Sequence, residues 1–119
     1  MTLKPDDAAK FMAVADEMRR KAVAAGDQSY GAVVVKDGKI VGWGPSRVVT
    51  KGDPTAHAEM EAIRDAAARL KSQDLSGCSM VSTSKPCPMC ETAASWASLD
   101  ELIYTAALTN GGRPGYRRC

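Results

Sequence analysis

Hydrophobic residues recur at steps of three and four positions in the first quarter of the chain. These positions are Phe11, Val14, Met18 and Ala22. Their spacing predicts an amphipathic helix over residues 6–25, because the charged residues lie mostly between the apolar ones. Asp6 suits the first turn of this helix, and Gly26 would end it.

The pattern changes after residue 29 to short runs of β-branched and apolar residues. Tyr30–Lys36 and Lys39–Trp43 flank the dipeptide Asp37-Gly38, which predicts a β-hairpin with a two-residue turn. The unbroken run Val33-Val34-Val35 predicts a strand that is covered on both faces.

Helical and extended patterns then alternate along the chain. Four further elements are predicted, at residues 57–71 (helix), 78–83 (strand), 88–98 (helix) and 102–107 (strand). The predicted apolar face of the first of these helices consists of Met60, Ile63, Ala67 and Leu70. Residues 109–119 are rich in Gly, Pro and Arg, and we predict a loop or a flexible tail there.

The order of these elements predicts an α/β fold. A strand, a helix and a second strand with short connections imply a parallel pair with a right-handed crossover. We therefore expect a three-layer α/β/α sandwich, whose mixed sheet has an antiparallel N-terminal hairpin followed by parallel strands. Residues 1–119 should form a single domain. The helices at His57 and Pro88 would start at the carboxyl ends of strands, where open α/β sheets place their ligand sites.

Composition narrows the classes of function. The formal net charge is +2, which is too weak to indicate nucleic-acid binding. The exception is a basic cluster in the tail, formed by Arg113, Arg117 and Arg118. Four cysteines fit a reducing compartment better than a disulfide framework. We expect a cytoplasmic protein, because the N-terminal stretch has no apolar signal core and no apolar run approaches the length of a membrane span.

Candidate metal ligands occur at the starts of two predicted helices. His57 is the single histidine of the chain, and Cys87 and Cys90 have the spacing of a shared metal site. Zinc takes imidazole nitrogen and thiolate sulfur, and a catalytic zinc site keeps three protein ligands and a fourth position for water. Zinc can lower the pKa of that water from about 15.7 to about 7. Glu59 would supply a carboxylate that carries protons without being a ligand.

The spacing of His57 and Glu59 requires a particular place in the helix. Residues two apart diverge in a regular helix, so the pair can share a site only in the first turn. Pro54 and the alanine-rich segment after it put the helix start there, and flanking prolines do the same for the cysteines. Two helix N-termini would then direct partial positive charge at the metal, which favours thiolates.

Other interpretations of these residues stay open at this point. A lone C-x-x-C could be a redox pair, or half of a structural zinc site in a non-catalytic interaction domain. The structural site would need a fourth ligand, which Cys78 or Cys119 could offer. His57 alone could be an ordinary helix-start residue, and Glu59 alone a solvated first-turn acid. All four motif residues in this order favour a catalytic zinc site.

Three stretches support a family resemblance: Gly31–Gly38, Asp53–Glu59 and Pro86–Cys90. The order H-x-E followed by P-C-x-x-C is the signature of zinc-dependent nucleobase deaminases. From about Tyr30 to Leu108 the sequence resembles the cytidine deaminase superfamily, and within it the guanine deaminase and tRNA adenosine deaminase branch.

The resemblance implies hydrolytic deamination at a Zn²⁺ held by His57, Cys87 and Cys90. Glu59 would take a proton from the attacking water and pass it to a ring nitrogen and then to the leaving ammonia. The implied substrate contacts are Ser46, Ala58, Pro86 and Trp96. Trp96 resembles a tryptophan of guanine deaminases and could be a flat wall for the ring, or equally a core aromatic.

Two features depart from the family pattern. An asparagine aimed at the substrate is usual in the loop after the hairpin, and Ser46 stands in its place. Family members also continue past the last strand predicted here with another strand and a helix. We therefore expect either that the sheet ends early or that a partner subunit replaces the missing part. An exposed edge at Leu102–Ala107 would favour a homodimer.

These observations favour a small-molecule substrate, a free aminated ring such as guanine or a related purine or triazine. The weak net charge offers little of the phosphate-tracking surface on which nucleic-acid affinity relies. The alternative is a tRNA-specific adenosine deaminase, which a basic surface would distinguish.

Overall fold

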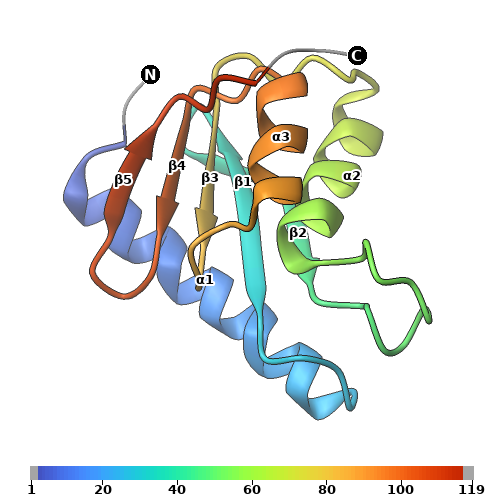
Figure 1. The fold of residues 1–119 in the computed structure, drawn as a ribbon. Helices are drawn as coiled ribbons and strands as arrows, with labels where there is room; N and C mark the ends of the chain where they lie inside the picture. Colours follow the sequence, from blue (N-terminus) through green and yellow to red (C-terminus); the bar gives the residue numbers. More distant parts are fainter. Residues whose placement is uncertain (1–2, 117–119) are drawn as a thin grey trace.

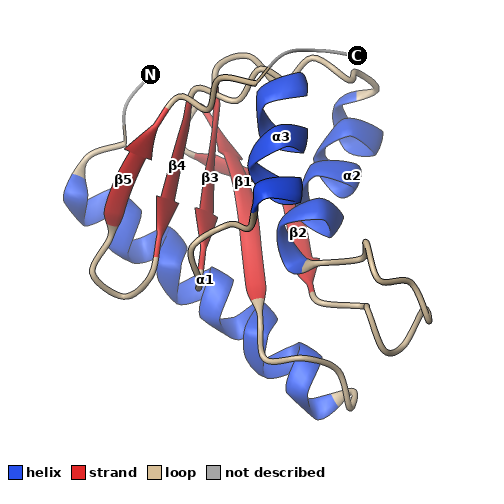
Figure 2. Cartoon of the chain, viewed as in Figure 1, coloured by secondary structure: helices blue, strands red, loops and turns tan. Residues whose placement is uncertain are grey.

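The structure, a computed structural model, describes residues 3–116 (Figure 1). Its elements are α1 (Pro5–Ala24), β1 (Gly31–Lys36), β2 (Lys39–Pro45), α2 (Ala58–Leu70), β3 (Cys78–Ser82), α3 (Pro88–Trp96), β4 (Glu101–Tyr104) and β5 (Thr109–Gly112). The strands form one sheet in the order β2-β1-β3-β4-β5. Helix α1 covers one face of this sheet, and α2 and α3 cover the other (Figures 1 and 2). The predicted α/β/α layers are confirmed.

Strand β1 is the centre of the fold. It pairs antiparallel with β2 and with β3, and β3 pairs parallel with β4, which confirms the predicted hairpin and the parallel crossover. Asp37 and Gly38 have φ values of 51° and 75°, as a two-residue hairpin turn requires. Val33 and Val35 pack against the α1 layer, whereas Val34 packs against the α2 layer. The strand is covered on both faces, as predicted.

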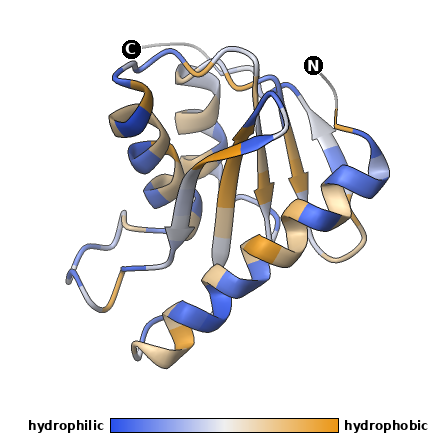
Figure 3. Cartoon of the chain, turned by 180° about the vertical axis from the view of Figure 1, so that it is seen from behind, coloured by the Kyte–Doolittle hydropathy of each residue, from blue (hydrophilic) through white to orange (hydrophobic). Residues whose placement is uncertain are grey.

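Hydrophobic residues concentrate in the middle strands of the sheet, whereas the helices also carry hydrophilic residues (Figure 3). Phe11 and Ala22 of the predicted stripe are buried in α1, together with Ala8 and Ala15. Val14 and Met18 are partly buried against the cluster around Phe11, so the helix lies on the sheet largely along the stripe expected from its sequence. No helix within residues 3–116 is both long enough and apolar enough to cross a membrane.

The sequence prediction of loop after residue 108 is wrong for β5. Strand β4 ends at Tyr104 rather than at residue 107, since Thr105 and Leu108 adopt positive φ values of 64° and 55° in the turn that follows. The chain returns as β5, antiparallel to β4. Asn110 Nδ2 donates a hydrogen bond of 2.8 Å to Glu101 Oε2. Because β5 covers β4, the edge predicted at 102–107 is not exposed.

The predicted apolar face of α2 is also wrong in part. The side chains that pack in the core are the small ones, Ala58, Ala62 and Ala66, with Ile63 and Leu70 at the margin. The row of alanines on α2 meets glycines on β2 where the two elements cross. Because both sides are small, the helix backbone approaches the strand closely. A Cβ atom on Gly44 would lie 2.1 Å from the carbonyl oxygen of Ala58.

Gly44→Ala is therefore expected to lower the free energy of unfolding by about 1–3 kcal/mol or more, the usual cost of overpacking a core. The added methyl group can be accommodated only if α2 moves away from the sheet, and α2 carries His57 at its start. Urea unfolding followed by circular dichroism measures the change. Gly115→Ala is the matched control, because a Cβ at Gly115 meets no atom of the described residues 3–116 within 4 Å. Equal midpoints for the two variants would contradict this close packing.

Candidate metal centre

The helix that follows His57 and the helix that follows Cys87 begin at the same edge of the sheet. Strands β2 and β3 run in the same direction, since each is antiparallel to β1, so their carboxyl ends share an edge. Helix α2 starts after the loop that leaves β2, and α3 starts shortly after β3. The N-termini of α2 and α3 consequently lie side by side (Figure 1), as the sequence predicts.

Two of the candidate ligands occupy the cap positions of these helices. His57 is the N-cap of α2, with φ −60° and ψ 155°, and Cys87 is the N-cap of α3, with φ −74° and ψ 169°. Neither side chain forms a hydrogen bond that caps its own helix. Their donor atoms are therefore available to a shared ligand. Cys90 lies in the first turn of α3, on the side facing them.

The three donor atoms form a nearly equilateral triangle. Nδ1 of His57 lies 3.6 Å from Sγ of Cys87 and 3.7 Å from Sγ of Cys90, and the two sulfur atoms are 3.6 Å apart. A tetrahedral zinc with usual bond lengths requires about 3.8 Å between two sulfur ligands and about 3.6 Å between sulfur and nitrogen. The residues therefore fit zinc, and three ligands leave a fourth position for water or substrate.

Glu59 lies beside this triangle, in the first turn of α2, and is only 4% exposed. Burial raises the pKa of its carboxyl group above the ordinary value, and a hydrogen bond from its own backbone N–H partly opposes this. Burial likewise raises the pKa of the Cys90 thiol, and the neighbouring Glu59 carboxylate raises it further. A metal ion that binds here must displace that proton.

A cavity of about 290 Å³ opens beside the triangle. It is lined by Gln28, Tyr30, His57, Ala58, Glu59, Ser84, Lys85 and Cys87. Three of these residues, His57, Glu59 and Cys87, belong to the sequence motifs, so the space for a substrate adjoins both the candidate ligands and the carboxylate.

Four expected substrate contacts have different positions. Ala58 lines the cavity, and Pro86 is buried immediately before Cys87. Ser46 does not line it; its hydroxyl donates a 3.0 Å hydrogen bond to Asp27. The side chain of Trp96 is 41% exposed on α3 and lines another hollow. Trp96 is thus neither a wall of this cavity nor a core aromatic.

The cavity residues that sequence reasoning missed come from two segments. Gln28 and Tyr30 lie just before β1, and Ser84 and Lys85 lie just before the cysteine motif. The signal that could have identified Gln28 and Tyr30 is the direction of β1 in the sheet. Because β1 is antiparallel to its neighbours, its N-terminal end reaches the edge where the other strands end.

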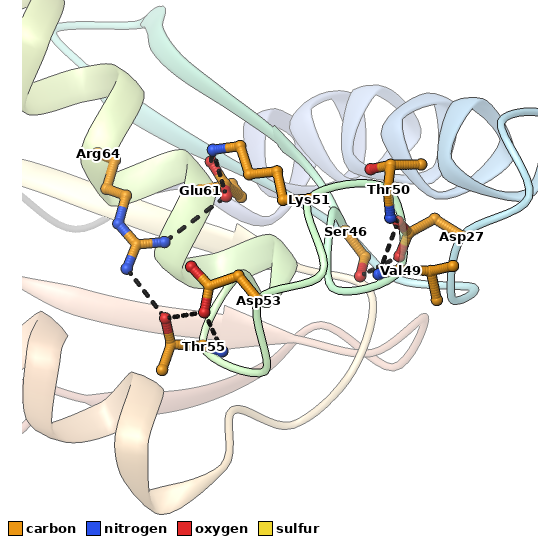
Figure 4. A network of polar contacts seen from close by, with 9 residues as sticks. All are labelled: Asp27, Ser46, Val49, Thr50, Lys51, Asp53, Thr55, Glu61 and Arg64. Atoms are coloured by element: carbon orange, nitrogen blue, oxygen red, sulfur yellow. Dashed lines mark hydrogen bonds and ion pairs between the residues drawn. The ribbon is translucent and has the colours of Figure 1, made fainter.

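Asp27 anchors the loop between β2 and α2 (Figure 4). Its carboxylate accepts hydrogen bonds from the backbone N–H groups of Val49 and Thr50, at 3.1 and 2.8 Å, and from the Ser46 hydroxyl. Desolvation would raise the pKa of Asp27, but these hydrogen bonds and one from Gln28 hold it far below its ordinary value. The carboxylate therefore stays ionised and keeps the loop in place.

Two further carboxylates hold the end of the same loop that leads to His57 (Figure 4). Asp53 accepts hydrogen bonds from Thr55, at 2.8 Å to the backbone N–H and 2.7 Å to the hydroxyl. Glu61, buried in α2, accepts a hydrogen bond of 2.9 Å from Lys51. His57 is thus approached by a segment with defined geometry.

The remaining cysteines do not extend the metal cluster within the described chain. Cys78 is fully buried in the core beneath α2 and is absent from the group of His57, Cys87 and Cys90, whose donor atoms lie within 4.8 Å of one another. Cys119, Arg117 and Arg118 lie outside the described residues. Of the basic cluster expected in the tail, Arg113 pairs with Asp100 at 3.3 Å.

Comparison with known proteins bears on the chemistry of this centre. The family model of the cytidine and deoxycytidylate deaminase zinc-binding region matches residues 5–106. Guanine deaminase of Bacillus subtilis (strain 168) is 42% identical over 87 residues, which cover 73% of this chain and 56% of that protein. The tRNA-specific adenosine deaminase of Aquifex aeolicus (strain VF5) is 38% identical over 96 residues, which cover 81% of this chain and 64% of that protein.

A solved structure of one of these relatives also has a similar fold. The X-ray structure of Bacillus subtilis guanine deaminase matches with a TM-score of 0.80 at 38% identity, covering 87% of this chain and 65% of that one. The chain spans less than two thirds of the length of both curated relatives. The fold and the zinc-binding region of the family are therefore shared, while relatives of similar identity carry names with different substrates.

Proposed function

Because this chain belongs to the family of the cytidine and deoxycytidylate deaminase zinc-binding region, we propose that it catalyses the hydrolytic deamination of a small free aminated ring, guanine or a related purine or triazine. The products would be the hydroxylated or oxo ring and ammonia. The observation that carries this proposal is the position of a buried carboxylate, Glu59, beside three donor atoms with zinc geometry and an adjoining cavity.

Each motif residue has a role in this reaction. His57, Cys87 and Cys90 hold zinc, which when bound activates water as a nucleophile at neutral pH. Glu59 takes one proton from the attacking water and passes it to the ring nitrogen beside the amine-bearing carbon. It then takes the second proton from the new hydroxyl group and gives it to the amine, which leaves as ammonia. Its raised pKa suits a group that must both accept and donate a proton. Ala58, at the start of α2, positions the ring with its backbone.

The size of the cavity supports a small substrate. Ligand sites for drug-sized molecules usually enclose about 300–1,000 Å³, and the cavity at Glu59 has about 290 Å³. Lys85 is the one cationic side chain that residues 3–116 contribute to its lining, so little of this wall is suited to phosphate groups. A single heteroaromatic ring fills such a space without an attached polynucleotide.

Release of ammonia from free rings tests this proposal against the tRNA alternative. Zinc-loaded protein is incubated with guanine, other aminopurines and aminotriazines, and separately with transcribed tRNA that is then analysed for inosine. We expect ammonia from at least one free ring and no inosine. The tRNA alternative is kept because of the Aquifex aeolicus relative; efficient editing without activity on any free ring would establish it in place of our proposal.

We further propose that the protein is a homodimer that associates through the exposed side of α2 and α3. With β4 covered by β5, the exposed edge expected at residues 102–107 no longer supports association. An apolar hollow of about 340 Å³ lies instead on these helices, lined by Met60, Pro88, Met89, Thr92, Ala93 and Trp96. Small and flexible apolar side chains allow close packing of a second copy. The thiol-bearing metal site supports a cytoplasmic location, where reduced cysteines persist.

Trp96→Glu is expected to convert the dimer to a monomer, because it places a charge in an apolar contact. Light scattering at micromolar concentration measures the mass of both proteins. Val23→Glu is the matched control, since Val23 is an exposed apolar residue on α1, on the other face of the sheet. A monomeric wild type, or a Trp96→Glu variant that is still dimeric, would contradict this proposal.

A further inference from the structure

Of the described residues that line the cavity at Glu59, Gln28 alone presents a carboxamide. It lies at the exposed rim, between α1 and β1. Within residues 3–116 its side chain finds no hydrogen-bond partner, whereas its backbone N–H donates a hydrogen bond of 2.8 Å to Asp27 Oδ1. The backbone at Gln28 is therefore held while its carboxamide is available to a ligand.

Asp27 connects this rim to the loop that carries His57. One carboxylate oxygen accepts from the Gln28 backbone and from the Ser46 hydroxyl, and the other accepts from Val49 and Thr50. Gln28 is consequently fixed relative to the segment that leads into the metal cluster. Ser46 is committed to this contact, so its hydroxyl does not reach the cavity.

We propose that Gln28 is the residue that selects the substrate ring, through hydrogen bonds to the polar edge of the ring that faces away from the metal ligands. This inference rests on the proposed function and deepens it. A carboxamide offers one acceptor oxygen and two donor hydrogens, so it can pair with an adjacent ring N–H and C=O at once. Asp27 acts as a positioning residue for Gln28.

The proposal favours rings that carry an amide-type edge. Guanine has an N–H donor next to a C=O acceptor, whereas 2-aminopurine has the same amine but lacks the carbonyl. A site whose polar group loses its partner rejects the analogue that lacks it. The wild-type protein should therefore prefer guanine to 2-aminopurine, and this preference should depend on Gln28.

The test compares kcat/KM for guanine and for 2-aminopurine in zinc-loaded wild type, Gln28→Leu and Gln28→Glu. Gln28→Leu is expected to lower kcat/KM for guanine by about tenfold, the scale of one lost hydrogen bond, mainly by raising KM, with little change for 2-aminopurine. Gln28→Glu, which only accepts hydrogen bonds, should lower the value for guanine as well. Gln73→Leu is the control, because Gln73 is exposed between α2 and β3. Zinc content should be equal in all four proteins.

An unchanged ratio of the two substrates in Gln28→Leu would overturn the inference and leave the proposed function standing. Failure of the wild type to deaminate any free ring would instead count against the proposed function. In that case, equilibrium dialysis of guanine with zinc-loaded wild type and Gln28→Leu decides the inference: weaker binding by the variant supports it, and equal binding or none overturns it.

Discussion

Glu59→Gln is expected to lower kcat by about 10²–10⁴-fold, the usual contribution of a positioned acid–base group, while zinc content and fold are retained. Gln has nearly the same shape as Glu, so the packing of the 4% exposed side chain changes little. A carboxamide cannot take a proton from water and return it to the leaving amine. Ammonia release measures turnover, and metal analysis and circular dichroism measure the zinc content and the fold.

Glu61→Gln is a matched control for this experiment. Glu61 is also buried, in the same helix and two residues further on, but it accepts hydrogen bonds from Lys51 and does not line the cavity at Glu59. Its amide can still accept one of those bonds, so turnover should stay within a few fold of the wild type. A Glu59→Gln variant that keeps a tenth of the activity would show that Glu59 is not the proton carrier.

Cys87→Ser is expected to lose most of its zinc from about one equivalent per chain. The hydroxyl of serine stays protonated near neutral pH and is a poorer zinc ligand than thiolate sulfur. The remaining pair, Nδ1 of His57 and Sγ of Cys90 at 3.7 Å, then provides only two protein ligands. Turnover should fall with the zinc content.

Cys78→Ser separates loss of the ligand from loss of a buried thiol. Cys78 is fully buried in the core and lies outside the donor triangle, so this variant should be less stable to urea but keep its zinc. Elemental analysis after dialysis measures the zinc content, and urea unfolding measures the free energy of unfolding. Full zinc retention in Cys87→Ser, or equal loss in both variants, would contradict the ligand assignment.

Local sequence signals were sufficient for the helix starts and for the hairpin. The two-residue turn between β1 and β2 requires positive φ values that few residue pairs adopt easily. Asp37-Gly38 adopts them, and the hairpin forms where the sequence predicts it. His57 and Glu59 can share a site only at a helix start, and His57 is the N-cap residue of α2. The expected sharing of one site by His57, Cys87 and Cys90 is met by donor atoms 3.6–3.7 Å apart.

The sequence by itself determined the type and spacing of the candidate zinc ligands, because these are properties of short segments. Only the tertiary structure decided which residues surround these ligands. Gln28 reaches the cavity because β1 runs opposite to its neighbours, so the start of β1 meets the carboxyl end of β3, which Lys85 follows. Residues 109–112 form a strand because β4 supplies their hydrogen-bond partners, although they have no apolar pattern of their own. Backbone pairing and close approach between distant segments leave no periodic trace in either segment, so these features required the assembled fold.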